Sequence, residues 1–160
     1  MRTLAPRWRS VSTLMRALND ALVQRKVEGR YLTLLLLAWH RHSRRFTICN
    51  AGGSPPMVCR DGELMRLQVE GVPLGLLPDR DYDEISFEAQ SGDVIILFSD
   101  GVSEHQGANH KEYGRARIAK VLREHAKAPV SEIRDAIFAD LDRFSEGRFD
   151  DQTVIAIRVE

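Results

Sequence analysis

The sequence is poor in the features that most quickly reveal what a protein does. It has only two cysteines, Cys49 and Cys59, whose spacing suits neither a metal cluster nor a disulfide framework, so we expect free thiols in a reducing compartment. The longest apolar run, YLTLLLLAW at residues 31–39, is far shorter than the roughly 20 residues of a membrane helix. No continuous apolar stretch near the start resembles a secretory signal. We therefore expect a cytoplasmic protein without a membrane span.

Net charge is also absent, since 23 Lys and Arg balance 23 Asp and Glu, but the charge is unevenly distributed. Residues 1–45 contain ten basic and two acidic residues, which leaves 13 basic and 21 acidic residues in the remainder. An acidic body suits a hard cation better than nucleic acid. The basic segment carries no nucleic-acid-binding motif, so we expect no nucleic-acid partner. The weaker alternative, a basic helix that contacts nucleic acid, would require steeply salt-dependent binding.

The spacing of apolar residues predicts a mixture of helices and antiparallel strands. Helical periodicity covers residues 11–26, 118–125 and 133–144. Strand-like segments cover residues 31–39, 46–49, 85–88, 94–99 and 153–159. Asp61-Gly62 lies between two short strand-like runs and predicts a hairpin with a type I′ turn. Hairpins in the middle of the chain, with helices set apart from them, favour an α+β domain whose sheets are covered by helices.

One strand-like segment ends unusually, because ILFS at residues 96–99 leads directly into Asp100-Gly101. The common explanation is a turn in which glycine supplies a positive φ angle. However, Asp150 and Asp151 stand immediately before the last strand-like segment. If the two strands are antiparallel neighbours, all three aspartates emerge at one edge of a sheet. Carboxylate oxygens are the ligands that Mg²⁺ and Mn²⁺ prefer, so this arrangement predicts a cation site with Asp151 turned partly away.

Five segments carry a resemblance to a known family: NAGGSPPMV, GVPLGLLP, SGDVIILFSDGVSE, YGRARIAKVL and FDDQTVIAI. In this order and spacing they resemble the C-terminal two-thirds of PPM-type metal-dependent serine/threonine phosphatases, in the SpoIIE/RsbU-like bacterial branch. The resemblance implies that residues 1–160 are one PPM phosphatase-like domain, in its C-terminal part. It also implies an antiparallel β-sandwich flanked by helices, without its opening strands, and a two-metal Mn²⁺ or Mg²⁺ site.

The resemblance also assigns roles to individual residues. Asp100 matches the aspartate of the family's Thr-Asp-Gly motif, and Asp150 matches the first aspartate of its Asp-Asp-x-Thr motif, so both are expected to be catalytic metal ligands. Asp151 is expected to ligate occasionally or to lie behind the ligands. His105 is either an acid near the leaving oxygen or, more commonly for such a residue, a solvated loop histidine.

The implied activity is hydrolysis of phosphoserine or phosphothreonine on a regulatory protein, such as an anti-sigma factor antagonist in bacterial partner switching. The alternative is an inactive phosphatase-like module that binds a partner protein, and metal-dependent hydrolysis would separate the two. The family's Gly-Asp-x-x-Asp segment, whose aspartate bridges the metals, has no counterpart before Arg9. We therefore expect little activity from these 160 residues alone. We also expect an uncovered sheet edge that favours a homo-oligomer.

Overall fold

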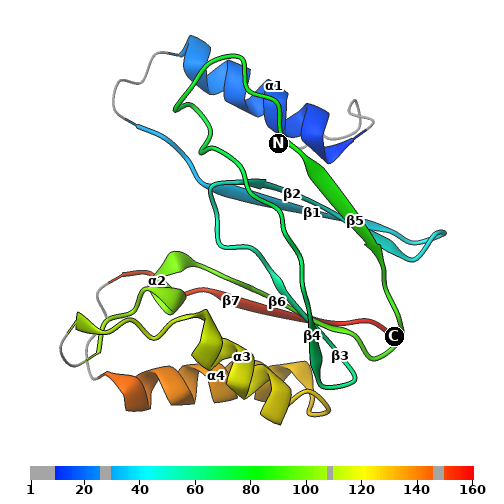
Figure 1. The fold of residues 1–160 in the computed structure, drawn as a ribbon, viewed down its shortest axis with the longest axis vertical. Helices are drawn as coiled ribbons and strands as arrows, with labels where there is room; N and C mark the ends of the chain where they lie inside the picture. The colour runs from blue at the N-terminus through cyan, green and yellow to red at the C-terminus, as the bar shows by residue number, and fades with distance from the viewer. Residues whose placement is uncertain (1–9, 26–29, 108–109, 146–149) are drawn as a thin grey trace. The chain divides into compact units, whose positions relative to one another are not determined.

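The computed structural model describes residues 10–25, 30–107, 110–145 and 150–160, and it divides the chain into two compact units. The first unit comprises residues 1–55 and 68–89, and the second comprises residues 56–67 and 90–160. Each unit contains one antiparallel sheet with helix packed on it (Figure 1). The predicted α+β class is therefore confirmed. No helix within the described ranges has the length and apolar character needed to cross a membrane.

The first unit packs one helix on a three-stranded sheet. The strand order is β1-β2-β5, and the elements are α1 (Val11–Gln24), β1 (Leu34–His40), β2 (Arg45–Ala51) and β5 (Glu84–Glu88). Ser10 caps α1, because its hydroxyl accepts a hydrogen bond from the Thr13 N–H at 3.2 Å. Met15 is fully buried in a core completed by residues of β2 and the loop before β5: Cys49, Ala51, Leu74 and Tyr82. The helical face predicted from the sequence is thus the face that packs on the sheet.

The first strand begins three residues later than the apolar run predicts. Leu32 exchanges two backbone hydrogen bonds with Leu74, at 3.0 and 2.8 Å, instead of pairing with β2. The β1 to β2 ladder then starts where Leu34 lies opposite Ala51. The apolar composition of the run does not indicate whether Leu32 pairs with Leu74 or with β2. The predicted end of the helix at residue 26 lies outside the described residues.

Asn19 connects α1 to the segment that follows residue 71, which the sequence predicts as a structured loop. Its side-chain oxygen accepts a hydrogen bond from the Gly75 N–H at 2.9 Å, and its amide donates to the Leu77 carbonyl at 3.0 Å. The Asn19 side chain is fully buried. A buried polar residue of the helix therefore supplies hydrogen-bond partners to two backbone groups of this partly buried loop.

The second unit contains a four-stranded antiparallel sheet. Its order is β4-β3-β6-β7, with β3 (Met57–Arg60), β4 (Glu63–Met65), β6 (Val94–Phe98) and β7 (Val154–Arg158). The predicted hairpin between β3 and β4 is confirmed, because Asp61 and Gly62 have φ angles of 51° and 83°. Positive φ at both central residues is what a type I′ turn requires. Both cysteines are free, as predicted, and the structure shows that both are buried.

Two helices, α3 (Arg115–Glu124) and α4 (Val130–Phe144), lie side by side on this sheet (Figure 1). Their buried faces include Ile118, Leu122, Ile133 and Ile137, which pack against the sheet core. Both helices were predicted by periodicity, although α3 starts three residues before residue 118. Together they bury one face of the β6 and β7 pair, which carries the candidate site at its end.

Candidate metal centre

The strands β6 and β7 are antiparallel neighbours, with Phe98 opposite Val154. Beyond this pair, Ser99 extends the contact with three hydrogen bonds. Its N–H donates to the Thr153 carbonyl, its hydroxyl accepts from the Thr153 N–H, and the same hydroxyl donates to the Asp151 carbonyl, each at 3.0 Å. The end of β6 and the start of β7 therefore lie at one edge of the sheet. Asp100, Asp150 and Asp151 are brought to this edge, as the sequence predicts.

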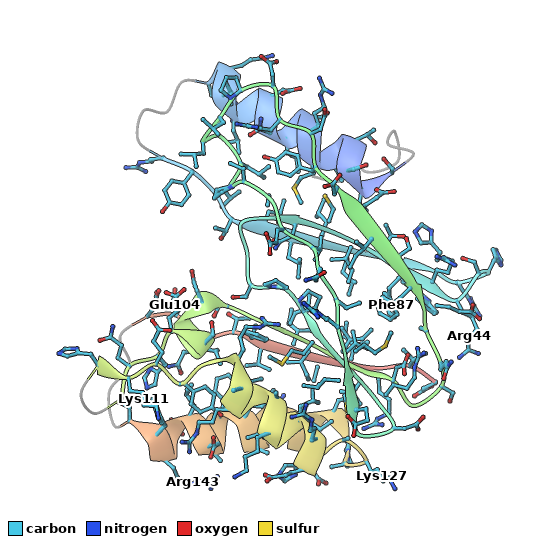
Figure 2. The ribbon with its side chains drawn as sticks, in the orientation of Figure 1. Arg44, Phe87, Glu104, Lys111, Lys127 and Arg143 are labelled. Atoms are coloured by element: carbon cyan, nitrogen blue, oxygen red, sulfur yellow. The ribbon has the colours of Figure 1, made fainter. Side chains whose placement is uncertain are left out.

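The prediction of a simple turn at Asp100-Gly101 is wrong. These residues open a four-residue helix, α2 (Asp100–Ser103), and Gly101 does not have a positive φ angle. Glu104, which follows this helix, is labelled in Figure 2. A Cβ atom on residue 101 would lie 2.3 Å from the Asp151 carbonyl oxygen and 3.3 Å from the Asp150 Cβ. Glycine is needed here because it lets the two carboxylate-bearing segments touch.

Each of the two expected ligands is oriented by the backbone that follows it. One carboxylate oxygen of Asp100 accepts a hydrogen bond from the Gly101 N–H at 2.9 Å, and one of Asp150 accepts from the Asp151 N–H at 2.7 Å. All three aspartate side chains are exposed. Within the described part of the chain, the second oxygen of Asp100 and of Asp150 accepts no hydrogen bond. These oxygens are therefore available to a cation from solvent.

The expected metal-binding atoms at this edge are the carboxylate oxygens of three aspartates. Oxygen atoms of this kind are the ligands that a hard divalent cation prefers. In the four described ranges, no group of three or more His, Cys, Asp or Glu side chains could hold a metal ion. Mg²⁺ is commonly bound by one or two carboxylates while it keeps several waters. The described residues thus fit a cation that is held partly by Asp100 and Asp150, and they do not enclose one.

His105 lies beneath this edge and is 4% exposed. Its Nδ1 lies 3.2 Å from the side-chain nitrogen of Gln152, and its carbonyl accepts a hydrogen bond from the Tyr113 N–H at 2.8 Å. The interpretation of His105 as a solvated loop residue is therefore wrong, while an acid role stays a prediction. Sequence reasoning missed Gln152 altogether, because nothing in the local pattern links it to a histidine 47 residues away.

Comparison with known proteins gives a consistent assignment. The chain matches the family described as Stage II sporulation protein E (SpoIIE) over residues 1–160. It is 27% identical over 150 residues to the phosphoserine phosphatase RsbU of Bacillus subtilis, which covers 92% of this chain and 44% of that protein. The chain therefore spans less than half the length of this relative.

Two solved structures share the fold. The PP2C phosphatase domain of SpoIIE from Bacillus subtilis, with a fragment of its regulatory domain, has a TM-score of 0.82 at 22% identity and covers 99% of this chain and 47% of that one. The RsbU and RsbW domains of Rv1364c from Mycobacterium tuberculosis have a TM-score of 0.81 at 23% identity and cover 98% and 44%. The chain therefore belongs to the family described as Stage II sporulation protein E (SpoIIE).

Proposed function

We propose that this chain carries part of the active site of a metal-dependent phosphatase that removes phosphate from serine or threonine of a regulatory protein. The observation that supports it best is the β6 to β7 pairing, which brings Asp100 and Asp150 to one sheet edge. On each of them, one carboxylate oxygen accepts no hydrogen bond from the described residues. In support of the cation, the related SpoIIE phosphatase domain has a structure presoaked with Mn, and the related RsbX has one with magnesium. Mn²⁺ or Mg²⁺ is therefore the proposed cofactor.

When bound, the cation supplies an acidified water as nucleophile and neutralises charge on the phosphate. The residues of this chain hold and orient it. Asp100 and Asp150 would hold the cation, and the Gly101 and Asp151 N–H groups orient their carboxylates by hydrogen bonding to one oxygen of each. Asp151 adds a third negative charge at the same edge. Because no nucleophilic serine or cysteine is required, no covalent enzyme intermediate forms.

The proposed substrate is a phosphorylated protein of a partner-switching pathway, such as an anti-sigma factor antagonist, and the proposed location is the cytoplasm. The name of the relative RsbU, a phosphoserine phosphatase, supports the substrate class. The free state of both cysteines supports a reducing location. Burial, together with the carboxylates of Glu84 and Asp83, raises the pKa of Cys49 to about 11, so this thiol reacts slowly.

The test is phosphate release from a phosphoserine protein by the protein that carries this domain, with Mn²⁺ and with chelator. Asp100→Asn or Asp150→Asn should each lower activity about 10²-fold or more, since loss of a ligand should exceed the 10–100-fold typical of residues behind the ligands. Asp142→Asn, which removes an exposed carboxylate on α4, is the matched control and should change activity less than about threefold.

Variants at Asp100 and Asp150 that retain activity within a factor of a few would show that these are the wrong residues. Cation binding without any phosphate release would instead favour the inactive binding module. That module would hold a partner protein by the same edge of the sheet without turnover.

A further inference from the structure

Within the described residues, a pair of side chains connects the two carboxylate-bearing segments. His105 follows α2, which begins with Asp100, and Gln152 follows Asp151 directly. The Gln152 side-chain nitrogen lies 3.2 Å from the His105 Nδ1. This hydrogen bond spans 47 residues of sequence and joins the segments on which both proposed ligands are carried.

The histidine side of the pair is rigidly held. The ring is buried, and the His105 carbonyl accepts the Tyr113 N–H at 2.8 Å. Two residues earlier, the Ser103 carbonyl accepts the Gly114 N–H at 2.8 Å. Backbone hydrogen bonds to the segment that leads into α3 therefore hold residues 103–105 in place. The buried His105 ring presents its Nδ1 as the acceptor for the Gln152 side-chain nitrogen.

The glutamine side of the pair has fewer constraints. Asp150 and Asp151 are exposed, and residues 150–153 come before the ladder of β7 begins at Val154. The contacts that tie this segment to α2 are the Ser99 hydrogen bonds, the approach to Gly101 and the Gln152 to His105 bond. Among these contacts, only the Gln152 to His105 bond is a hydrogen bond made by a side chain of residues 150–153. Gln152 is therefore the side chain through which this segment reaches the residue that follows α2.

We propose that His105 and Gln152 form a positioning pair that holds the Asp100 and Asp150 segments at the separation needed to bind one divalent cation together. The inference rests on the proposed function, since it assumes that these two aspartates are the ligands. Neither residue of the pair touches the cation. Their effect is on the geometry of the ligands, and loss of such supporting contacts typically lowers metal affinity 10–100-fold.

The test compares three variants of this chain by Mn²⁺ titration, with free Mn²⁺ followed by electron paramagnetic resonance. Gln152→Leu keeps the size of the side chain and removes the bond, so it should raise the Mn²⁺ Kd about 10–100-fold. His105→Asn keeps an acceptor near the position of Nδ1 and should hold the Kd within about threefold of the wild type. Gln106→Leu is the matched control, because Gln106 pairs with His110 in the same loop, at 3.3 Å, without joining the two segments.

A second measurement needs no metal. With chelator present, hydrogen exchange at the Asp151 and Thr153 N–H groups should become at least tenfold faster in Gln152→Leu and stay unchanged in Gln106→Leu. Thermal unfolding without metal distinguishes an effect of the pair on the positions of the aspartates from an effect on the stability of the fold. His105→Asn leaves a small cavity and should lower the melting temperature without loss of Mn²⁺ affinity, a combination that a purely structural role does not produce.

The outcomes distinguish this inference from the function on which it rests. A wild-type chain that binds no Mn²⁺, or binds it equally well as Asp100→Asn, overturns the proposed function and the positioning role with it. A wild-type chain that loses Mn²⁺ on Asp100→Asn but keeps its Kd within twofold on Gln152→Leu overturns the positioning pair alone. Unchanged hydrogen exchange in Gln152→Leu does the same.

Discussion

Asn19 illustrates how much one buried polar side chain can contribute to this fold. We expect Asn19→Leu to lower the free energy of unfolding by about 1–3 kcal/mol, because it removes the hydrogen-bond partner of the part-buried Gly75 N–H and Leu77 carbonyl. Urea denaturation would measure this. Gln24→Leu, at an exposed position of the same helix, is the control and should cost less than about 0.5 kcal/mol. A loss below 1 kcal/mol in Asn19→Leu would mean that water replaces the amide.

Asp140 provides a pH-dependent contribution to stability. Its carboxylate accepts hydrogen bonds from Arg117 at 2.8 and 3.1 Å, from the Tyr113 hydroxyl at 2.8 Å and from Arg143 at 3.2 Å. The Arg117 hydrogen bonds are the main cause that holds the pKa of Asp140 below its usual range, and they outweigh the opposing effect of burial. The folded state therefore favours the ionised carboxylate more strongly than the unfolded chain does.

Asp140→Asn should consequently reduce stability at neutral pH and matter less in acid. We expect a loss of about 1–2 kcal/mol at pH 7, a modest value because Arg117 is partly solvated. Because the folded-state pKa is the lower one, the wild-type advantage is complete above the unfolded pKa of about 3.9 and declines as the pH falls below it. Urea denaturation at pH 7 and pH 3 checks this. A difference between wild type and variant that grows in acid would contradict it.

The two Asp-Gly pairs show what a short sequence can and cannot predict. At Asp61-Gly62 the positive φ angles are a local property of the dipeptide, and the hairpin was predicted correctly. At Asp100-Gly101 the same dipeptide begins a helix, because its neighbour is the Asp151 carbonyl some 50 residues further along the chain. Local propensity has no information about that neighbour. The sequence identified the aspartates of the candidate site, but it did not show why residue 101 must be glycine.

At the scale of elements, the short helix α2 depends on its contact with the segment before β7. In an ordinary helix, replacing glycine with alanine stabilises by up to about 1 kcal/mol. We expect Gly101→Ala to destabilise instead, by about 1–3 kcal/mol, because the new Cβ would lie 2.3 Å from the Asp151 carbonyl oxygen. It should also weaken Mn²⁺ binding, since the two segments must separate.

Thermal unfolding and Mn²⁺ titration measure both effects of this change. Ser103→Ala is a suitable control, because it alters another buried residue of α2 without adding atoms, and it should cost less than about 1 kcal/mol. An increase in the melting temperature of Gly101→Ala would refute the close approach between α2 and the segment before β7.

Elements that bury a long periodic face were predicted well, and elements defined by a distant partner were not. The helices α1, α3 and α4 are each at least ten residues long and carry their apolar residues at helical spacing, so their periodicity is visible in the sequence. The four residues of α2 make only one turn and leave no such pattern. The start of β1 was misplaced for the related reason that Leu32 pairs with Leu74, a residue outside any strand.

At the scale of the whole molecule, a divalent cation should stabilise the chain. Without metal, the carboxylates of Asp100, Asp150 and Asp151 repel one another at one sheet edge, and a cation that binds only the folded state stabilises it by mass action. Mn²⁺ at a hundredfold excess over its Kd should contribute about 2.7 kcal/mol. Melting curves with Mn²⁺ and with chelator measure this directly.

The same curves for an Asp100→Asn/Asp150→Asn double variant should coincide. A wild-type melting temperature that does not respond to millimolar Mn²⁺ would count against any cation site in this chain. The expected homo-oligomer, the single-domain organisation and the identity of the phosphoprotein stay predictions, because they depend on surfaces and partners that a folding pattern does not encode.

The pairing of β6 with β7 also sets an order of events during synthesis on the ribosome. Between these adjacent strands the chain runs through three helices, α2, α3 and α4, before it returns to the same sheet. A nascent chain that has emerged only as far as α4 holds Asp100 but lacks Asp150, the Ser99 contacts and Gln152. Contacts so distant in sequence close late in folding. The proposed cation site is therefore complete only after β7 has been translated.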